Sequence, residues 1–411
     1  MERRKLVGEK FSVLIMILMI LTTVMVSLTS LTTNVVIRNS GTIVRISPLH
    51  VEGRYIKDIL GNVVTLRGIN KHGFEDYPTG IWQRPDGSIT NKWEPETVKA
   101  NLNAMKTWGI NTIRIHTAIN FWKYNIGNFR QNIKDLLTWA GERGIYVIYD
   151  CYSVVDYFSE GCQPDPLPYP PYNSRPDVIG SEDEFVEFWV SLANELKSYP
   201  NVLFELWNEP HIHENYTWAE MRESWKNVTQ RCINAIRATG ASNIIVASWC
   251  WGIWANLNYP WELPPGPVRD PAATLDWVMI FNLSDPLDNI LYDTHLYRGD
   301  IIRSKPEWVD CWTYDDIKLG LQYCWVEYVL YNITKPLLLG EVGPNMWASG
   351  EELERELAFY NNTLKLCKEY EMSFCGFWWW PTGKYAHLTN QPNYQPNRAG
   401  EILIKSLQTL S

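Results

Sequence analysis

The stretch 182–210, EDEFVEFWVSLANELKSYPNVLFELWNEP, contains the pattern that decides the fold. In its first eighteen residues the apolar side chains recur every three or four positions, which predicts an amphipathic helix. Residues 202–208 then form a short apolar run of the kind typical of a buried strand. A helix followed at once by a buried strand is one unit of an α/β fold.

The same alternation recurs along the chain. Helical patterns also cover 95–108, with Pro95 at the helix start, and 350–370. Eight strands are predicted, at 66–70, 111–116, 145–150, 202–208, 243–249, 290–297, 336–341 and 374–380. Eight units favour a closed (β/α)8 barrel over an open doubly wound sheet. No GxGxxG or GxxxxGK[ST] motif follows the first strand, which weakens the nucleotide-binding alternative. Before the barrel, residues 51–66 predict a β-hairpin around Leu60-Gly61-Asn62.

Composition narrows the function classes. The chain has 411 residues, 45% hydrophobic and 20% charged, which excludes a disordered or coiled-coil protein. A formal net charge of −9 argues against nucleic acid as a partner. The 21 Trp and 22 Tyr supply flat apolar faces with a polar edge, which suit a sugar ligand.

The N-terminus predicts export. Basic residues precede the uncharged run 11–37, whose length suits a membrane-crossing helix. We therefore expect 1–37 to be a signal peptide or an uncleaved anchor, 38–50 a linker, and 51–411 the catalytic domain. The domain would lie outside the cell, secreted or tethered, and only the N-terminal segment would contact a membrane.

Eight cysteines without a CxxC pair disfavour a zinc site and are compatible with disulfides. Cys151–Cys162 and Cys311–Cys324 would each close a short loop, with buried free thiols as the alternative. The sequence His211-Ile212-His213 with Glu214 is too compact for a complete metal site, so we expect no metal.

Two predicted strands stop on a carboxylate. Asn208 and Glu209 follow the fourth strand, and Glu341 ends the seventh behind Gly340. The C-terminal ends of barrel strands form the active site, and two acids facing each other there suit glycosidic cleavage. Other strand ends supply further candidate site residues: Arg114, His116, His295, Tyr297, Trp378 and Trp380. Glu205, inside the fourth strand, is expected to be salt-bridged within the barrel.

The segments RGIN-KHGFE, NTIRIH, LFELWNEPH, YDTHLY, LLLGEVG and GFWWWP together resemble glycoside hydrolase family 5, the cellulase family, and in particular its bacterial and archaeal endoglucanases. The resemblance spans about residues 50–405. It implies a (β/α)8 barrel of retaining glycosidases, with Glu209 as acid/base and Glu341 as nucleophile.

The resemblance also implies supporting roles. Asn208 would bind the sugar 2-hydroxyl, Arg114 would hold the nucleophile, and His295 and Tyr297 would position the carboxylates and substrate. Trp378 would be the platform under the reacting sugar, with Trp380 as second choice. Where the family usually has a His after the third strand, this chain has Tyr152, with Asp150 nearby, which leaves the substrate subtype open.

Double displacement predicts carboxyl groups about 5–5.5 Å apart, with Arg114 favouring an ionised Glu341. We expect a monomer without cofactor that acts on a polysaccharide. The favoured activity is an endo-β-1,4-glucanase. The alternatives are a mannanase or another β-glycanase or β-glucosidase, a carbohydrate-binding barrel without activity, or a surface adhesion protein.

Overall fold

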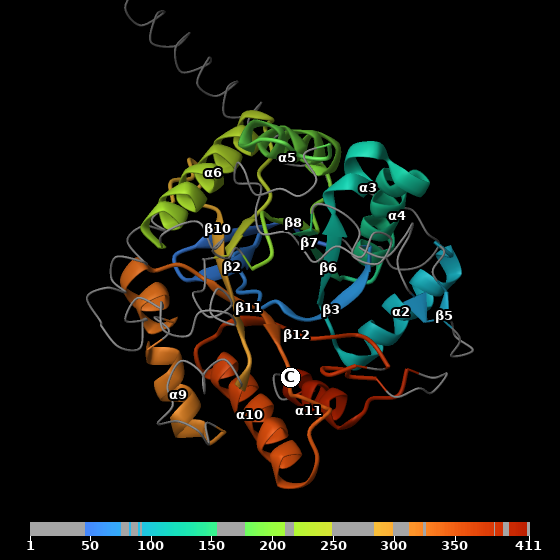
Figure 1. Cartoon of the computed structure of the whole chain (residues 1–411), viewed down its shortest axis with the longest axis vertical. Helices are drawn as coiled ribbons and strands as arrows, with labels where there is room; N and C mark the ends of the chain where they lie inside the picture. The colour runs from blue at the N-terminus through green and yellow to red at the C-terminus, as the bar shows by residue number, and fades with distance from the viewer. Residues whose placement is uncertain are drawn as a thin grey trace, which may run out of the picture. The chain divides into compact units, whose positions relative to one another are not determined.

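The core of the molecule is a closed barrel of eight parallel strands, with helices around it (Figure 1). The computed structural model describes residues 46–74, 82–83, 89–90, 93–153, 177–209, 218–248, 283–298, 312–323, 326–381, 383–388 and 394–408. The barrel strands, in chain order and in spatial order, are β3 (Arg67–Phe74), β6 (Thr112–Ala118), β7 (Tyr146–Ser153), β8 (Val202–Glu205), β9 (Ile245–Ser248), β10 (Ile290–Leu296), β11 (Leu337–Val342) and β12 (Ser373–Gly376), and β12 pairs with β3 to close the ring. The predicted (β/α)8 fold is confirmed, and the open sheet is excluded.

The described helices are α2 (Pro95–Trp108), α3 (Ile119–Tyr124), α4 (Phe129–Glu142), α5 (Glu182–Leu196), α6 (Trp218–Ala238), α9 (Tyr314–Tyr323), α10 (Gly350–Glu369) and α11 (Arg398–Gln408), with short helical turns η1 (Ile126–Asn128) and η4 (Tyr328–Ile333). Their ends follow local rules. Pro95 begins α2, and Gly109 ends it at φ 91°, in the left-handed region open to glycine. The Ser181 hydroxyl accepts a hydrogen bond from the Glu184 amide and so caps α5.

Each barrel strand divides its side chains between two environments with a period of two. In β7, Val147 and Tyr149 pack in the large core that includes the helices, whereas Tyr146 and Ile148 belong to a smaller cluster. This smaller cluster, the inner apolar cluster, consists of Leu49, Val51, Ile56, Leu66, Tyr146, Ile148, Leu203, Ile244, Val246, Leu291, Leu338 and Cys375. It fills the barrel interior near the N-terminal ends of the strands.

The N-terminal hairpin packs on this inner apolar cluster. β1 (Leu49–Glu52) and β2 (Tyr55–Asp58) are antiparallel, and the Val51 amide donates to Asn289 Oδ1 at 2.7 Å. The chain reverses again at the predicted Leu60-Gly61-Asn62 turn, after which Val63 pairs with Lys57. The predicted reversal at 60–62 is therefore present, and the structure adds a second one before it, because Gly53, at φ 59°, supplies the turn between β1 and β2. A second two-stranded pair joins β4 (Trp82–Gln83) and β5 (Ile89–Thr90).

One cysteine prediction can be compared with the structure, and other predictions fall on residues outside the described ranges. Cys151 is a free, buried thiol on β7, which corrects its predicted pairing with Cys162. Cys311 and Cys324, the His211–His213 motif and the predicted 1–37 segment all lie outside the described ranges. Within those ranges, no helix has both the length and the apolar character needed to cross a membrane.

Candidate active site

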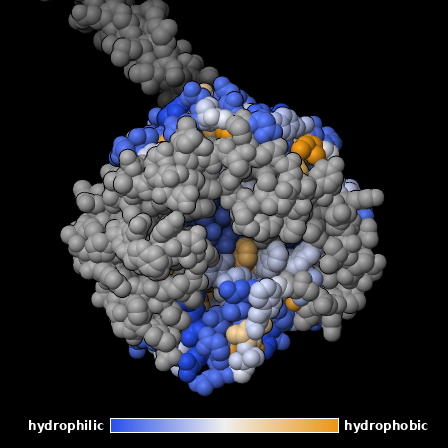
Figure 2. Space-filling view, viewed as in Figure 1, coloured by the Kyte–Doolittle hydropathy of each residue, from blue (hydrophilic) through white to orange (hydrophobic). Residues whose placement is uncertain are grey.

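The predicted site residues come together at the C-terminal end of the barrel. The face of the molecule seen in Figure 2 is hollowed at its centre, and hydrophilic residues lie deep in the hollow. Arg114 and His116 lie inside β6, His295 inside β10 and Glu341 inside β11. Asn208 and Glu209 follow β8, which ends at Glu205, three residues earlier than predicted. The period of two turns Arg114, His116 and His295 inward, on the same face as the inner apolar cluster.

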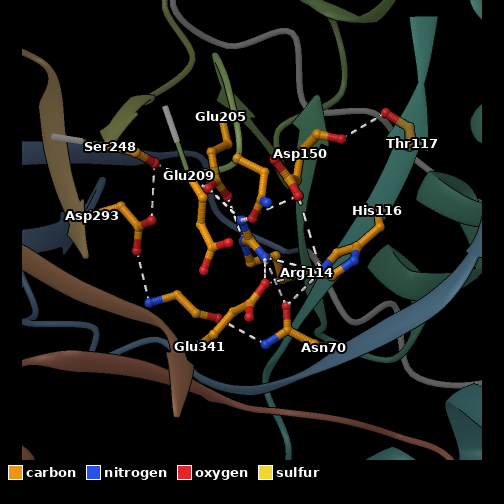
Figure 3. Close-up of polar contacts among 12 residues, drawn as sticks. Asn70, Arg114, His116, Thr117, Asp150, Glu205, Glu209, Ser248, Asp293 and Glu341 are labelled. Carbon is orange, nitrogen blue, oxygen red and sulfur yellow. Dashed lines mark hydrogen bonds and ion pairs between the residues drawn. The ribbon is translucent and has the colours of Figure 1, made fainter. Parts of the chain in front are cut away.

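Arg114 is the centre of the network (Figure 3). Its guanidinium is fully buried, and it donates to both carboxylate oxygens of Glu205 at 2.7 and 2.6 Å. It also donates to Glu341 Oε1 at 2.9 Å and lies 3.1 Å from Asp150 Oδ2. Further bonds join it to Asn70 Oδ1 at 3.0 Å and Asn208 Oδ1 at 2.9 Å. The expected salt bridge of Glu205 is thus confirmed, and so is the contact between Arg114 and Glu341.

A β-bulge turns Glu341 into the site. In β11, Leu337 and Leu339 face the helices and Leu338 faces inward, so strict alternation would point residue 341 outward. The pairing with β10 shifts after Thr294, so that Leu339 pairs with Thr294 but Glu341 pairs with His295. The extra residue is Gly340, and such bulges re-aim a neighbouring side chain.

Glu341 is buried and well supplied with donors. Besides Arg114, the Tyr297 hydroxyl donates to its Oε2 at 2.7 Å, and His116 Nε2 lies 3.6 Å from its Oε1. Burial raises the pKa of Glu341 above its ordinary value, and the nearby Glu209 adds to the rise. His295, Arg114 and Tyr297 act in the opposite direction because they stabilise the carboxylate.

Glu209 occupies a different environment. Its backbone adopts φ 42°, in the left-handed region that non-glycine residues seldom occupy, and such conformations cluster at functional sites. Its side chain is 25% exposed, and its Oε1 lies 2.6 Å from His295 Nδ1. One carboxylate oxygen of Glu209, one of Glu341 and a nitrogen of His295 lie within 4.8 Å of one another. The two glutamates therefore face each other closely, one buried and one at the rim.

His295 lies between acids on both sides. Its Nδ1 is also 3.6 Å from Glu341 Oε2, and its Nε2 is 3.4 Å from Asp293 Oδ2. Burial opposes a charge on the ring, but Glu341, Glu209 and Asp293 outweigh it and raise the pKa of His295 well above its ordinary value. His295 therefore holds its proton more tightly than an ordinary histidine does, and its Nδ1 contacts both glutamates.

The aromatic candidates surround the same hollow. Tyr152 is half-buried and stacks on His116 with ring centroids 4.4 Å apart, and burial raises the pKa of its hydroxyl group. Trp378 and Trp380, just after β12, are also half-buried. Their ring centroids lie 5.9 Å apart, and their ring planes make an angle of 37°. Trp379 between them is buried and donates to Asn101 Oδ1 at 2.8 Å. Of the three consecutive tryptophans, only 378 and 380 thus leave area for a ligand.

Three supporting residues escaped the sequence analysis. Asn70 donates to the Gly340 carbonyl at 2.7 Å, Asp293 accepts from the Gly340 amide at 2.7 Å, and Ser248 donates to Asp293 at 3.0 Å. Inward alternation could have indicated Asp293, which precedes His295 by two positions on the same strand. Asn70 ends the first predicted strand, within the RGIN segment, so the strand-end rule could have indicated it, whereas nothing in the local sequence marks Ser248.

The buried acids have shifted proton affinities. Burial raises the pKa of Glu205 to about 7, although Arg114 opposes the rise, and it raises the pKa of Asp150 as well. The sets Glu205–Asp293–His295 and Glu209–His295–Glu341 are compact enough to hold a cation. His295 belongs to both sets, however, and its raised pKa favours a positive charge there. We therefore interpret both sets as charge-compensated contacts.

Comparison with known proteins agrees with this geometry. The model of the family "Cellulase (glycosyl hydrolase family 5)" matches residues 61–383. Endoglucanase A of Butyrivibrio fibrisolvens is 27% identical over 260 residues, 61% of this chain and 46% of that protein. An endoglucanase of Clostridium saccharobutylicum is 27% identical over 301 residues, 71% of this chain and 51% of that protein. The chain thus spans about half the length of these curated relatives.

Solved structures show the same fold. The hyperthermophilic endocellulase of Pyrococcus horikoshii superposes with a TM-score of 0.62 at 18% identity, covering 88% of this chain and 99% of that one. The β-glucanase SdGluc5_26A of Saccharophagus degradans, in complex with cellotetraose, gives 0.61 at 20% identity, covering 92% and 98%. With the family model matched over most of the barrel, this chain belongs to the cellulase family, glycosyl hydrolase family 5.

Proposed function

We propose that the protein is a retaining β-glycanase that hydrolyses internal β-1,4 bonds of a glucan by double displacement. The observation that carries the proposal is the pair Glu209 and Glu341, whose closest oxygens lie within 4.8 Å across the barrel mouth. This separation suits a retaining pair at about 5–5.5 Å, whereas an inverting pair needs roughly 6.5–9.5 Å to admit a water.

The surroundings of the two glutamates support a division of roles. Glu341 accepts hydrogen bonds from Arg114 and Tyr297 on separate oxygens, which stabilises the carboxylate that must attack. Glu209 stands at the rim, where it can reach the oxygen of a leaving sugar. Glu341 is thus the nucleophile and Glu209 the acid/base.

The reaction then runs in two balanced steps. A Glu341 oxygen forms a bond to the anomeric carbon while the bond to the leaving oxygen breaks and the Glu209 proton moves to that oxygen. The negative charge on Glu341 disappears in the ester. Water next attacks the anomeric carbon, Glu209 takes the water proton, and the ester bond to Glu341 breaks.

Other site residues bind the sugar in this proposal. Arg114 engages Asn208 Oδ1, which turns the amide nitrogen of Asn208 toward a sugar 2-hydroxyl. Trp378 provides the stacking face, with Trp380 beside it. Tyr152, held flat on His116, supplies the contact that a His gives elsewhere in the family. The names of the relatives, endoglucanases, support glucan over mannan or xylan.

We also propose that residues 51–411 form the catalytic domain, that the protein acts outside the cell as a monomer, and that 1–37 exports or tethers it. The uncharged run 11–37 supports this proposal. Fractionation of producing cells, with the mass of the mature chain, tests it. Full-length protein inside the cell would contradict it.

Activity on a panel of carboxymethylcellulose, mannan, xylan and lichenan tests the proposed function, with Glu341→Gln as the background. We expect reducing ends to appear fastest from the β-1,4-glucan, with a rapid fall in viscosity that marks internal cleavage. Activity no greater than that of the variant on every polymer would overturn the proposal.

A further inference from the structure

Asp293 lies one layer below Glu209 and Glu341, beneath His295. It is fully buried on β10, two residues before His295. Its Oδ1 accepts a hydrogen bond from the Gly340 amide at 2.7 Å, and its Oδ2 accepts one from the Ser248 hydroxyl at 3.0 Å. The same Oδ2 lies 3.4 Å from His295 Nε2, an ion-pair distance. Three strands thus fix one carboxylate beneath the imidazole.

The neighbouring strand is shaped around this carboxylate. A Cβ atom at position 340 would lie 2.4 Å from Asp293 Oδ1, a distance no side chain could tolerate. Gly340 is also the bulge residue that turns Glu341 inward, and its carbonyl accepts from Asn70. The absence of a side chain at 340 therefore leaves room both for Asp293 and for the bulge.

The acids that face His295 come from β8, β10 and β11. Glu209 follows β8 and Glu341 lies on β11, both on the upper side of the ring, and Asp293 and Glu205 lie below it. Arg114 of β6 is the other cation, and it is paired with Glu205, Asp150 and Glu341. Asp293 instead has His295 as its cationic neighbour, at 3.4 Å.

We propose that Asp293 is a positioning residue that orients His295 and keeps it positively charged toward Glu209. A carboxylate on each side of the ring favours a proton on both nitrogens, so that Nδ1–H donates to Glu209 while Nε2–H faces Asp293. The raised pKa of His295 agrees with this arrangement. The consequence for turnover rests on the proposed function: the imidazolium stabilises the charge that develops on Glu209 as its proton leaves, so proton transfer to the leaving oxygen is faster while His295 is charged.

The test compares Asp293→Asn with the wild type by NMR titration of the full chain labelled in its seven histidines. The His295 signal is identified by its loss in His295→Gln. Asparagine keeps the shape and an acceptor for the Gly340 amide but removes the charge, so the His295 titration should move to lower pH. Asp285→Asn is the matched control, because Asp285 is a buried carboxylate that pairs with Arg237 at 2.8 Å at the other end of β10. It should leave the His295 titration unchanged.

Ser248→Ala is the milder second variant, since it removes one bond to Asp293 but keeps the charge. It should shift the His295 titration in the same direction as Asp293→Asn does, but by less. It also provides a test if Asp293→Asn fails to fold. An unchanged titration in both variants, or in Ser248→Ala alone where Asp293→Asn does not fold, would overturn the inference.

Kinetics give a second readout. The alkaline limb of the kcat/KM profile should move to lower pH in Asp293→Asn. At the alkaline side kcat/KM should fall on the order of tenfold, which is less than the 10²–10⁴-fold that a general acid itself contributes. The titration needs no substrate, so a wild type without glycanase activity would defeat the proposed function while the NMR result still decides on Asp293. An alkaline limb that stays in place despite a shifted titration would overturn the link to Glu209.

Discussion

The two ends of the barrel interior are built on the same strands with opposite chemistry. Near the N-terminal ends, the inward residues form the inner apolar cluster, on which the β1–β2 hairpin packs. Near the C-terminal ends, the inward residues are acids and their cations, centred on Arg114 and His295. Strand β7 changes from Ile148 to Asp150 over two residues, and β10 changes from Leu291 to Asp293.

The difference shows how one architecture separates stability from chemistry. Apolar burial contributes stability without specific partners. The upper half holds buried carboxylates that lose hydration on folding, so each needs a cation or a proton. Changes in the upper half should therefore alter proton affinities and turnover, whereas changes in the lower half should alter stability alone.

The largest expected effect is that of Glu341→Gln. Glutamine keeps the shape and a hydrogen bond to Tyr297 or Arg114 but cannot form the ester, so kcat should fall by roughly 10⁴-fold or more. Steady-state kinetics on soluble cello-oligosaccharides measure the loss, and calorimetry should still detect ligand binding. Glu401→Gln, in the exposed first turn of α11, is the control. Turnover of Glu341→Gln within tenfold of the wild type would refute the assigned nucleophile.

Glu209→Ala should lower kcat/KM for natural glycans by about 10²–10⁴-fold, because no proton reaches the leaving oxygen. An aryl cellobioside with an acidic leaving group, such as 2,4-dinitrophenol, needs no proton on that group. The rate of its first step, in which the ester forms, should therefore fall much less. The ratio of kcat/KM between the two substrates is the measurement. Equal losses on both would contradict a role as general acid.

Arg114→Met should lower the free energy of unfolding by about 3–5 kcal/mol, because it leaves Glu205, Asp150 and Glu341 without their common cation. Urea denaturation measures the loss.

Ile148→Ala, in the inner apolar cluster, should lower the free energy of unfolding by a comparable ~2–5 kcal/mol while leaving the pH profile of the remaining activity unchanged. A shifted pH profile in Ile148→Ala would show that the two halves are not independent.

The smallest effect concerns Glu205 and pH. Burial raises its pKa to about 7 from 4.5, so the folded state holds a proton that the unfolded state releases between these values. Stability from this group is full below pH 4.5 and falls as the pH rises through 7, by about 3 kcal/mol. Glu205→Gln should flatten the free energy of unfolding between pH 5 and 8. An equal slope in variant and wild type would contradict the raised pKa of Glu205.

Much of this organisation could be predicted from the sequence. The eight strands were predictable because each is a short apolar run, and Glu209 and Glu341 because a carboxylate at the end of such a run is conspicuous. The salt bridge of Glu205 followed from its place inside a buried strand. In each case local sequence carries the physical signal.

The rest depends on contacts between strands far apart in the chain. The bulge at Gly340 arises from its pairing with β10 and from bonds to Asn70 and Asp293, which no local pattern encodes. The free thiol of Cys151 reflects its outward position on β7, in the core against the helices. The turn at Gly53 was not predicted, although the reversal at Leu60-Gly61-Asn62 was, because β1, which pairs across it, begins in what the sequence suggested was a linker.

The pairing of Glu209 with Glu341 is tested most directly by trapping the covalent intermediate. A 2-fluoro cellobioside with an activated leaving group forms the ester quickly and releases it slowly, so mass spectrometry of the digested protein can locate the sugar. We predict one adduct per chain, on Glu341. An adduct on Glu209, or no adduct under conditions in which the natural glycan is cleaved, would contradict the account.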